Sequence, residues 1–149
     1  MTTRHDRILF LLARLAKTVN IANRVEVPLE NLKRPDANFF LHNRTIATDV
    51  SITHPASKTY CRAAARTLGA AAIREKDKKR EYSDQAKAEN LDFVPFVLES
   101  FGGFGKCATS LVEDLVSEGL LNGIESLGGM GVRIFWTWAI SICLQSGNA

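Results

Sequence analysis

The sequence predicts an α/β domain with a mixed central sheet of about four strands flanked by helices. A helical pattern of apolar residues opens the chain, and short alternating segments follow it around two aspartates. An alanine-rich, charged stretch and a nearly continuous apolar run come next. The resulting order of elements is helix, three strands, helix, strand and helix, with one extra helix at the C-terminus. This order is typical of helices packed on a mixed sheet.

The first two elements are predicted over residues 3–18 and 19–27. Ile8, Leu11, Leu12 and Leu15 recur at helical spacing, which predicts an amphipathic helix over 3–18. Residues 19–27 alternate between apolar and polar side chains until Pro28, which indicates a strand.

A β-hairpin is predicted next. Residues 37–41 and 44–52 alternate, and His42-Asn43 between them is a plausible tight turn. Side chains alternate along a strand, so Ile46, Thr48, Val50 and Ile52 share one face, while Thr45, Ala47, Asp49 and Ser51 share the other.

The second half of the chain is predicted to be mostly helical. Residues 58–88 form either one long helix or two helices with a kink at Gly69. Residues 91–99 read as a buried strand, which Pro95 pushes toward an edge or a bulge. A helix over 106–121 follows, then a glycine-rich joint at 127–131 and an apolar helix over 132–145. We therefore expect one domain over 1–123, and a segment over 124–149 that packs on this domain or on a partner.

Composition limits the possible functions. The chain has 149 residues, a net charge of +3, 46% hydrophobic residues and three cysteines. The length fits one domain, and the mild positive charge gives weak support for a polyanionic partner. The cysteines lack zinc-site and disulfide-framework spacing, and no apolar run is long enough to span a membrane. We expect an intracellular protein without zinc and without a membrane span.

Asp36 and Asp49 are the main candidate functional residues. Pro35 comes directly before Asp36, and Asp49 lies in the second strand of the predicted hairpin. A hairpin that brings two carboxylates together supplies the oxygen ligands that Mg²⁺ prefers, with the Val50 carbonyl as a third ligand. Such an ion would neutralise charge on a phosphate and activate a water for phosphodiester hydrolysis. The alternative is an ordinary turn aspartate and an ordinary strand aspartate.

The pattern resembles the PD-(D/E)xK nucleases, the restriction-endonuclease-like superfamily. In that motif, Pro-Asp opens one core strand, and an acidic residue in the next strand is followed two positions later by lysine. Pro35-Asp36 and Asp49 match this motif, but Ser51 stands where lysine is expected.

A narrower resemblance is to the restriction-like endonuclease domain that follows the reverse transcriptase of site-specific non-LTR retrotransposons. That domain combines Lys/Arg-Pro-Asp, a second aspartate and a later K-x-x-K-Y segment. Here Lys33-Arg34-Pro35-Asp36, Asp49 and Lys78-Lys79-Arg80-Glu81-Tyr82 correspond, with Glu81 in place of the second lysine. The resemblance implies a restriction-endonuclease-like core over 1–123 that nicks DNA with Mg²⁺ or Mn²⁺. It also implies a reverse transcriptase domain as partner and a nuclear location.

The resemblance assigns further roles on the helix that follows the hairpin. Lys78 would be the active-site lysine, with Lys76 and Lys79 as competitors, and Tyr82 would be catalytic unless it only packs. Arg74, Lys76, Lys79 and Arg80 are candidate DNA phosphate contacts, or else a solvated helix face. Three acidic residues are secondary candidates: Glu99 as a ligand or, in preference, a capping residue, and Asp6 and Glu26 as outer-shell acids.

Two other functions remain open. Ser51, Glu81 and the apolar helix over 132–145 are compatible with a catalytically decayed or domesticated copy that only binds nucleic acid or protein. A related nuclease such as a junction resolvase would share the metal site and differ in substrate.

Overall fold

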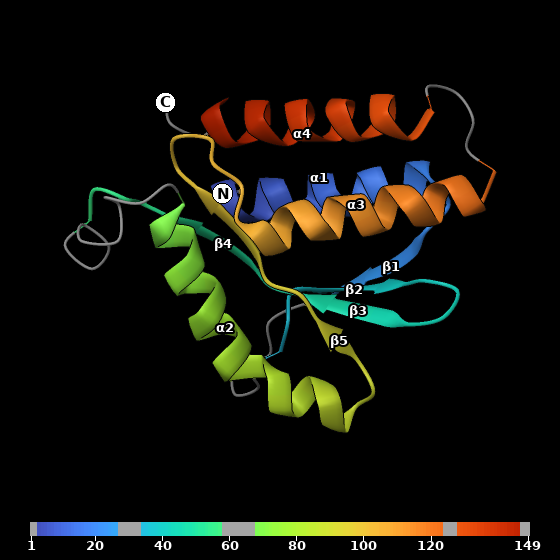
Figure 1. Ribbon diagram of the computed structural model, residues 1–149, viewed down its shortest axis with the longest axis horizontal. Helices are drawn as coiled ribbons and strands as arrows, with labels where there is room; N and C mark the ends of the chain where they lie inside the picture. The colour runs from blue at the N-terminus through green and yellow to red at the C-terminus, as the bar shows by residue number, and fades with distance from the viewer. Residues whose placement is uncertain (1–2, 27–33, 58–67, 124–127, 147–149) are drawn as a thin grey trace.

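The computed structural model describes residues 3–26, 34–57, 68–123 and 128–146, and it has the predicted α/β architecture (Figure 1). The elements in chain order are α1 (Arg4–Thr18), β1 (Ala22–Val25), β2 (Ala37–Phe40), β3 (Thr45–Thr48), β4 (Val50–Thr53), α2 (Gly69–Ala88), β5 (Asp92–Phe93), β6 (Phe96–Glu99), α3 (Lys106–Leu121) and α4 (Gly128–Ser146).

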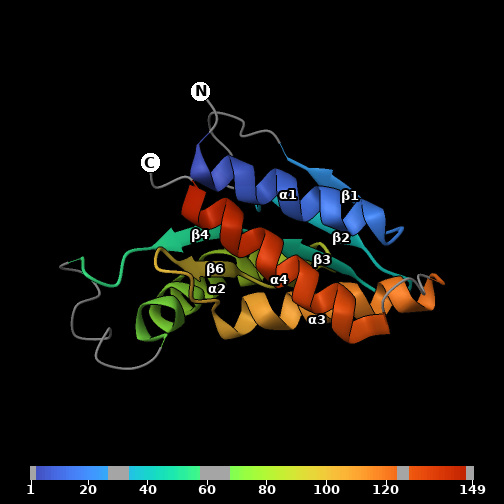
Figure 2. The same ribbon diagram turned by 90° about the horizontal axis from the view of Figure 1, so that it is seen from above.

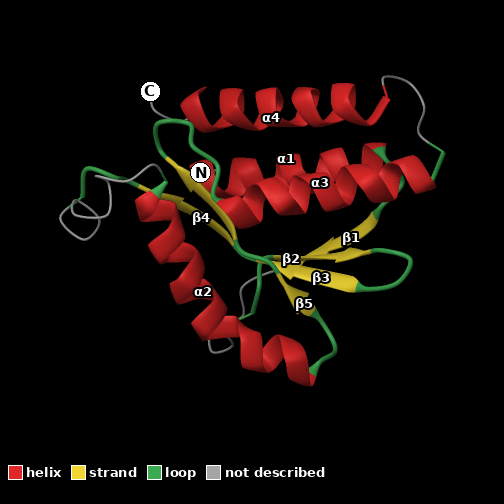
Figure 3. Cartoon of the chain, in the orientation of Figure 1, coloured by secondary structure: helices red, strands yellow, loops and turns green. Residues whose placement is uncertain are grey.

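The strands form two small sheets that meet near the middle of the molecule (Figure 3). The larger sheet has the order β1-β2-β3-β5 and is mixed, because β1, β2 and β3 pair antiparallel while β5 runs parallel to β3. The smaller sheet pairs β4 with β6 in parallel. The mixed sheet of four strands is therefore confirmed, and two of the predicted strands continue into a second sheet.

Helices lie on both sides of these sheets (Figures 1 and 2). The main hydrophobic core joins buried side chains of α1, α3 and α4 with those of β2, β3, β4 and β6. Helix α2 contacts β4, β5 and β6 and contributes no residue to that core. Figure 1 shows α2 apart from the other three helices, so the strands pass between α2 and the main core.

Helix α1 forms as predicted, and its start is fixed by a capping box. The Thr3 hydroxyl accepts a hydrogen bond from the Asp6 amide, and the Asp6 carboxylate accepts one from the Thr3 amide. The helix ends at Thr18, and Asn20 adopts a left-handed conformation with φ of 59°. This turn explains why the strand predicted over 19–27 begins only at Ala22.

Two helix boundaries differ from the prediction. Leu68 has a left-handed conformation with φ of 58° directly before Gly69, so a helix continuous through residue 68 is wrong. The part of that prediction over 58–67 lies outside the described residues. The glycine-rich joint is also wrong at 128–131, because Gly128 is the first residue of α4. Packing of the apolar face of α4 outweighs the poor helix propensity of its glycines.

Helix α4 packs against α1 and α3 along one face. Trp136, Ile140 and Leu144 on that face are buried in the main core, whereas Phe135 and Trp138 are about half exposed or more. The two tryptophans therefore occupy opposite environments on one helix.

We expect Trp136→Ala to lower the free energy of unfolding by about 3–5 kcal/mol, because it leaves a cavity in the main core. Trp138→Ala, at a side chain that is 61% exposed, is the matched control and should change it by less than about 1 kcal/mol. Urea unfolding followed by circular dichroism measures both. Equal effects would show that α4 is not packed as described.

Candidate active site

Asp36 and Asp49 lie next to each other where the two sheets meet. Asp36 precedes the first residue of β2, and Asp49 lies between β3 and β4. Ala37 pairs with Thr48 across the hairpin, which places the two aspartates side by side. The strand predicted over 44–52 is divided at Asp49, because β4 leaves β3 and pairs with β6. The strand predicted over 91–99 divides at Val94 and Pro95 beside it.

The two faces predicted for the segment 44–52 are confirmed around this junction. Ile46 and Val50 belong to the main core, and Ile52 packs against it. Asp49 and Ser51 instead contact α2, since Asp49 pairs with Lys78 and the Ser51 hydroxyl accepts a hydrogen bond from Arg74 Nε at 2.9 Å. Ser51, which stands where the nuclease motif has a lysine, therefore faces α2, the helix that carries Arg74 and Lys78.

Lys78 is the lysine that reaches the carboxylates. Its Nζ lies 2.7 Å from Asp49 Oδ2 and 3.9 Å from Glu81 Oε2, and its side chain is 12% exposed. Lys76 and Lys79 are exposed residues of the same helix. Of the three lysines that the sequence left open, Lys78 is therefore the one that is placed against a carboxylate of the Asp36–Asp49 pair.

Tyr82 lies one helical turn after Lys78 and is buried. Its ring packs on Phe93 with a centroid distance of 5.2 Å, and the Lys78 ammonium lies 5.6 Å from the ring centroid. Burial, with the nearby charges of Asp49 and Glu81, raises the pKa of Tyr82 to about 12. Tyr82 therefore keeps its proton at neutral pH and can donate a hydrogen bond. Its ring also packs against Phe93, as in the alternative to a catalytic role.

Asp36 is held by two hydrogen bonds to a single oxygen. The Val50 amide donates to Asp36 Oδ2 at 2.8 Å, and His5 Nε2 lies 3.0 Å from the same atom. The hydrogen bond to Asp36, partly opposed by burial, raises the pKa of His5 to about 9. Burial opposes ionisation of Asp36, but the bonds from His5 and Val50 together lower its pKa. Asp36 is therefore an anion, and His5 beside it is a cation, at neutral pH.

Sequence reasoning did not single out His5 as a site residue. It lies 31 positions before Asp36, in the first turn of α1, and no local pattern connects the two residues. Asp6, a candidate outer-shell acid, does reach the site, because its Oδ1 lies 3.2 Å from His5 Nδ1. Val50 reaches the site through its amide, whereas the predicted metal contact was its carbonyl oxygen.

The surroundings of Asp49 disfavour the ionised form of its carboxyl group. Burial and the negative charge of Asp36 raise its pKa to about 6, although Lys78 acts in the opposite direction. The negative charge of Asp36 disfavours ionisation of Asp49, and a divalent cation held by both carboxylates would remove this repulsion. The donor set of carboxylate oxygens fits Mg²⁺ or Mn²⁺. Within the described residues, no group of three or more His, Cys, Asp or Glu side chains is placed to hold a metal ion.

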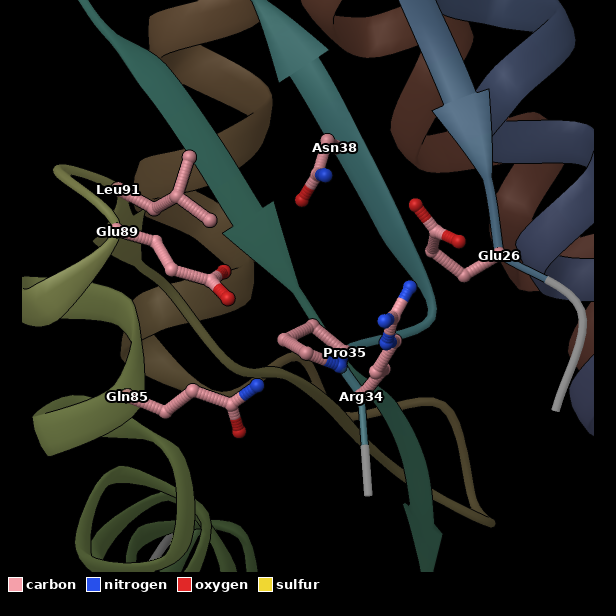
Figure 4. A pocket seen from close by; sticks show the side chains of 7 residues that line it. All are labelled: Glu26, Arg34, Pro35, Asn38, Gln85, Glu89 and Leu91. Atoms are coloured by element: carbon pink, nitrogen blue, oxygen red, sulfur yellow. The ribbon is translucent and has the colours of Figure 1, made fainter. Parts of the chain in front are cut away.

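A polar pocket of about 120 Å³ is lined by seven residues, none of which is Asp36 or Asp49 (Figure 4). Pro35, which precedes Asp36, lines it, and Figure 4 shows Gln85 of α2 and Glu89, the residue that follows α2, opposite Arg34 and Glu26. Glu26 thus lines a neighbouring pocket and forms an ion pair with Arg24 at 3.4 Å.

The remaining candidate residues divide into structural and exposed groups. Glu99 Oε1 accepts a hydrogen bond from the Ala71 amide at 3.2 Å, which confirms the preferred capping role at the start of α2. Arg74, also a predicted DNA contact, donates a hydrogen bond from Nε to the Ser51 hydroxyl. Lys76, Lys79 and Arg80 are exposed on α2, where they could contact phosphates.

Comparison with known proteins gives no assignment. No family model matches this chain, and no curated protein matches it. No helix in the described part of the chain is long and apolar enough to cross a membrane.

The raised pKa of Asp49 predicts a pH dependence of stability in the absence of metal. The folded state keeps this proton up to about pH 6, while the unfolded chain loses it near the ordinary aspartate pKa of 3.8. Stability therefore falls as pH rises from about 4 to 6 and stays lower above that range. The free energy of unfolding of Asp49→Asn, measured relative to that of the wild type, should therefore increase by about 1–3 kcal/mol as the pH rises from 4 to 7. Urea unfolding in EDTA at several pH values measures this gain, and a difference independent of pH would contradict it.

Proposed function

We propose that this protein is a Mg²⁺-dependent DNA endonuclease with a restriction-endonuclease-like core. The observation that carries the proposal is the convergence of Asp36, Asp49 and Lys78, from three separate segments of the chain, where the two sheets meet. This is the residue set of a PD-(D/E)xK site, with the lysine supplied by α2 where the motif has a strand position. Mn²⁺ would serve as an alternative ion.

The residues of the site have complementary tasks in phosphodiester hydrolysis. Asp36 and Asp49 would hold the cation, which when bound neutralises charge on the scissile phosphate and favours ionisation of water. Lys78, only 12% exposed and within hydrogen-bond distance of Asp49, would orient the attacking water and offset the charge that develops in the transition state. Tyr82 would donate a hydrogen bond to a phosphate oxygen, and Lys76, Lys79 and Arg80 would contact the DNA backbone.

The substrate and partners follow from the resemblance described above. We infer that the protein nicks one strand of a DNA target, that it acts with a reverse transcriptase domain of the same element, and that it works in the nucleus. A junction resolvase would use the same site on branched DNA.

Nicking of supercoiled plasmid tests the proposal directly. The full chain with 5–10 mM Mg²⁺, on the order of the concentrations that saturate weak Mg²⁺ sites, should convert supercoiled DNA to open circles, and EDTA should abolish the conversion. A four-way junction substrate in the same assay separates the resolvase alternative. DNA binding without nicking under any of these conditions would sink the enzymatic proposal and favour a decayed copy that only binds nucleic acid.

A further inference from the structure

The first turn of α1 is connected to the Asp36 carboxylate by a chain of hydrogen bonds. His5 presents its two ring nitrogens to two different carboxylates, with Nε2 at 3.0 Å from Asp36 Oδ2 and Nδ1 at 3.2 Å from Asp6 Oδ1. The other oxygen of Asp6 accepts the Thr3 amide at 3.3 Å, and the Asp6 amide donates to Thr3 Oγ1 at 3.1 Å. Both ring nitrogens of His5 are thereby held by carboxylates.

This chain rests on a firmly packed helix. Ile8 and Leu12, within two turns of His5, are 0% exposed and belong to the main core. The capping box fixes the side chain of Asp6 against the helix start, and Asp6 in turn fixes the ring of His5. The position of the imidazole is therefore set by the core and does not depend on the loop that carries Asp36.

Both hydrogen bonds to Asp36 end on the same atom. His5 Nε2 and the Val50 amide, which come from α1 and β4, converge on Oδ2. Two donors on one oxygen define the plane of the carboxylate and direct Oδ1 to a separate partner. Without His5, only the Val50 amide would hold Oδ2, and the carboxylate, whose other contact is with Asp49, would turn more easily about its Cβ–Cγ bond.

We propose that His5 is a positioning residue, which holds the Asp36 carboxylate in the orientation in which it would hold the metal. The inference rests on the proposed function, because it assigns a task toward the metal of that site. Outer-shell partners that orient metal ligands typically change metal affinity by about 10–100-fold when they are removed.

The test compares variants that differ in their reach toward Asp36. His5→Ala removes the donor, His5→Asn is too short to reach Oδ2, and His5→Gln can place an amide donor near the position of Nε2. The matched control is His42→Ala, which removes another histidine–carboxylate contact, that of His42 with Glu118. Mn²⁺ dissociation constants of the full chain, measured by electron paramagnetic resonance, are the main readout. The Mg²⁺ concentration for half-maximal nicking is the second.

We expect the Mn²⁺ dissociation constant to rise about ten-fold or more in His5→Ala and His5→Asn. It should return to within about three-fold of the wild type in His5→Gln, and His42→Ala should leave it unchanged. Circular dichroism melting checks that the variants fold. We expect them to fold, because His5 lies in the first turn of α1.

The failure of the role proposed for His5 can be distinguished from the failure of the proposed function. If the wild type binds Mn²⁺ and His5→Ala binds it equally well, or if His5→Gln is as weak as His5→Ala, the positioning role is overturned while the proposed function stands. If the folded wild type binds no Mn²⁺ and does not nick, the proposed function itself fails, and the role of His5 fails with it.

Discussion

Asp49→Asn and Asp36→Asn are each expected to reduce Mg²⁺-dependent nicking by at least about a thousand-fold. Each substitution replaces a charged ligand oxygen by a neutral amide of the same shape, so the fold is kept while the charge that holds the cation is halved. A loss of about 4 kcal/mol of transition-state stabilisation corresponds to this factor. Initial rates of plasmid nicking at saturating Mg²⁺ give the measurement.

Asp92→Asn is the matched control for these two variants. Asp92 is more than half exposed and pairs at 3.4 Å with Arg44 on the outer part of the sheet. Its substitution should leave the nicking rate within about two-fold, since exposed ion pairs contribute little. Wild-type rates in either active-site variant would exclude the Asp36–Asp49 pair as the metal site.

Lys78→Gln is expected to have the second-largest effect, a loss of about 100- to 1000-fold in the nicking rate. The glutamine is nearly as long but carries no charge, so stabilisation of the developing negative charge is lost. The pairing of Lys78 with Asp49 at 2.7 Å predicts that this loss appears in the rate at saturating DNA and persists at every salt concentration.

Lys76→Gln and Lys79→Gln serve as controls on the same helix. Both lysines are exposed, so their removal should weaken DNA binding modestly and reduce its salt dependence, as expected for phosphate contacts. The rate at saturating DNA should stay within about three-fold of the wild type. A larger catalytic loss in either control than in Lys78→Gln would assign the active-site lysine differently.

Local patterns predicted the elements that depend on local chemistry. Helical spacing of apolar residues located α1 and α3, and the His42-Asn43 turn located the hairpin of β2 and β3. Period-two alternation also predicted that Asp49 and Ser51 face away from the main core. The boundaries failed where tertiary contacts outweigh propensity, at Leu68 and at the glycines that begin α4.

The chemistry of the candidate site follows from the sequence, because the Asp36 and Asp49 carboxylates are adjacent whenever this hairpin forms. Which basic side chains reach these carboxylates depends on tertiary packing. The packing of α2 across β4 selects Lys78 from a run of similar lysines, and the packing of α1 brings His5 to Asp36 across 31 positions. Such contacts depend on how helices cross the strands, and neither period nor spacing in the sequence encodes that crossing.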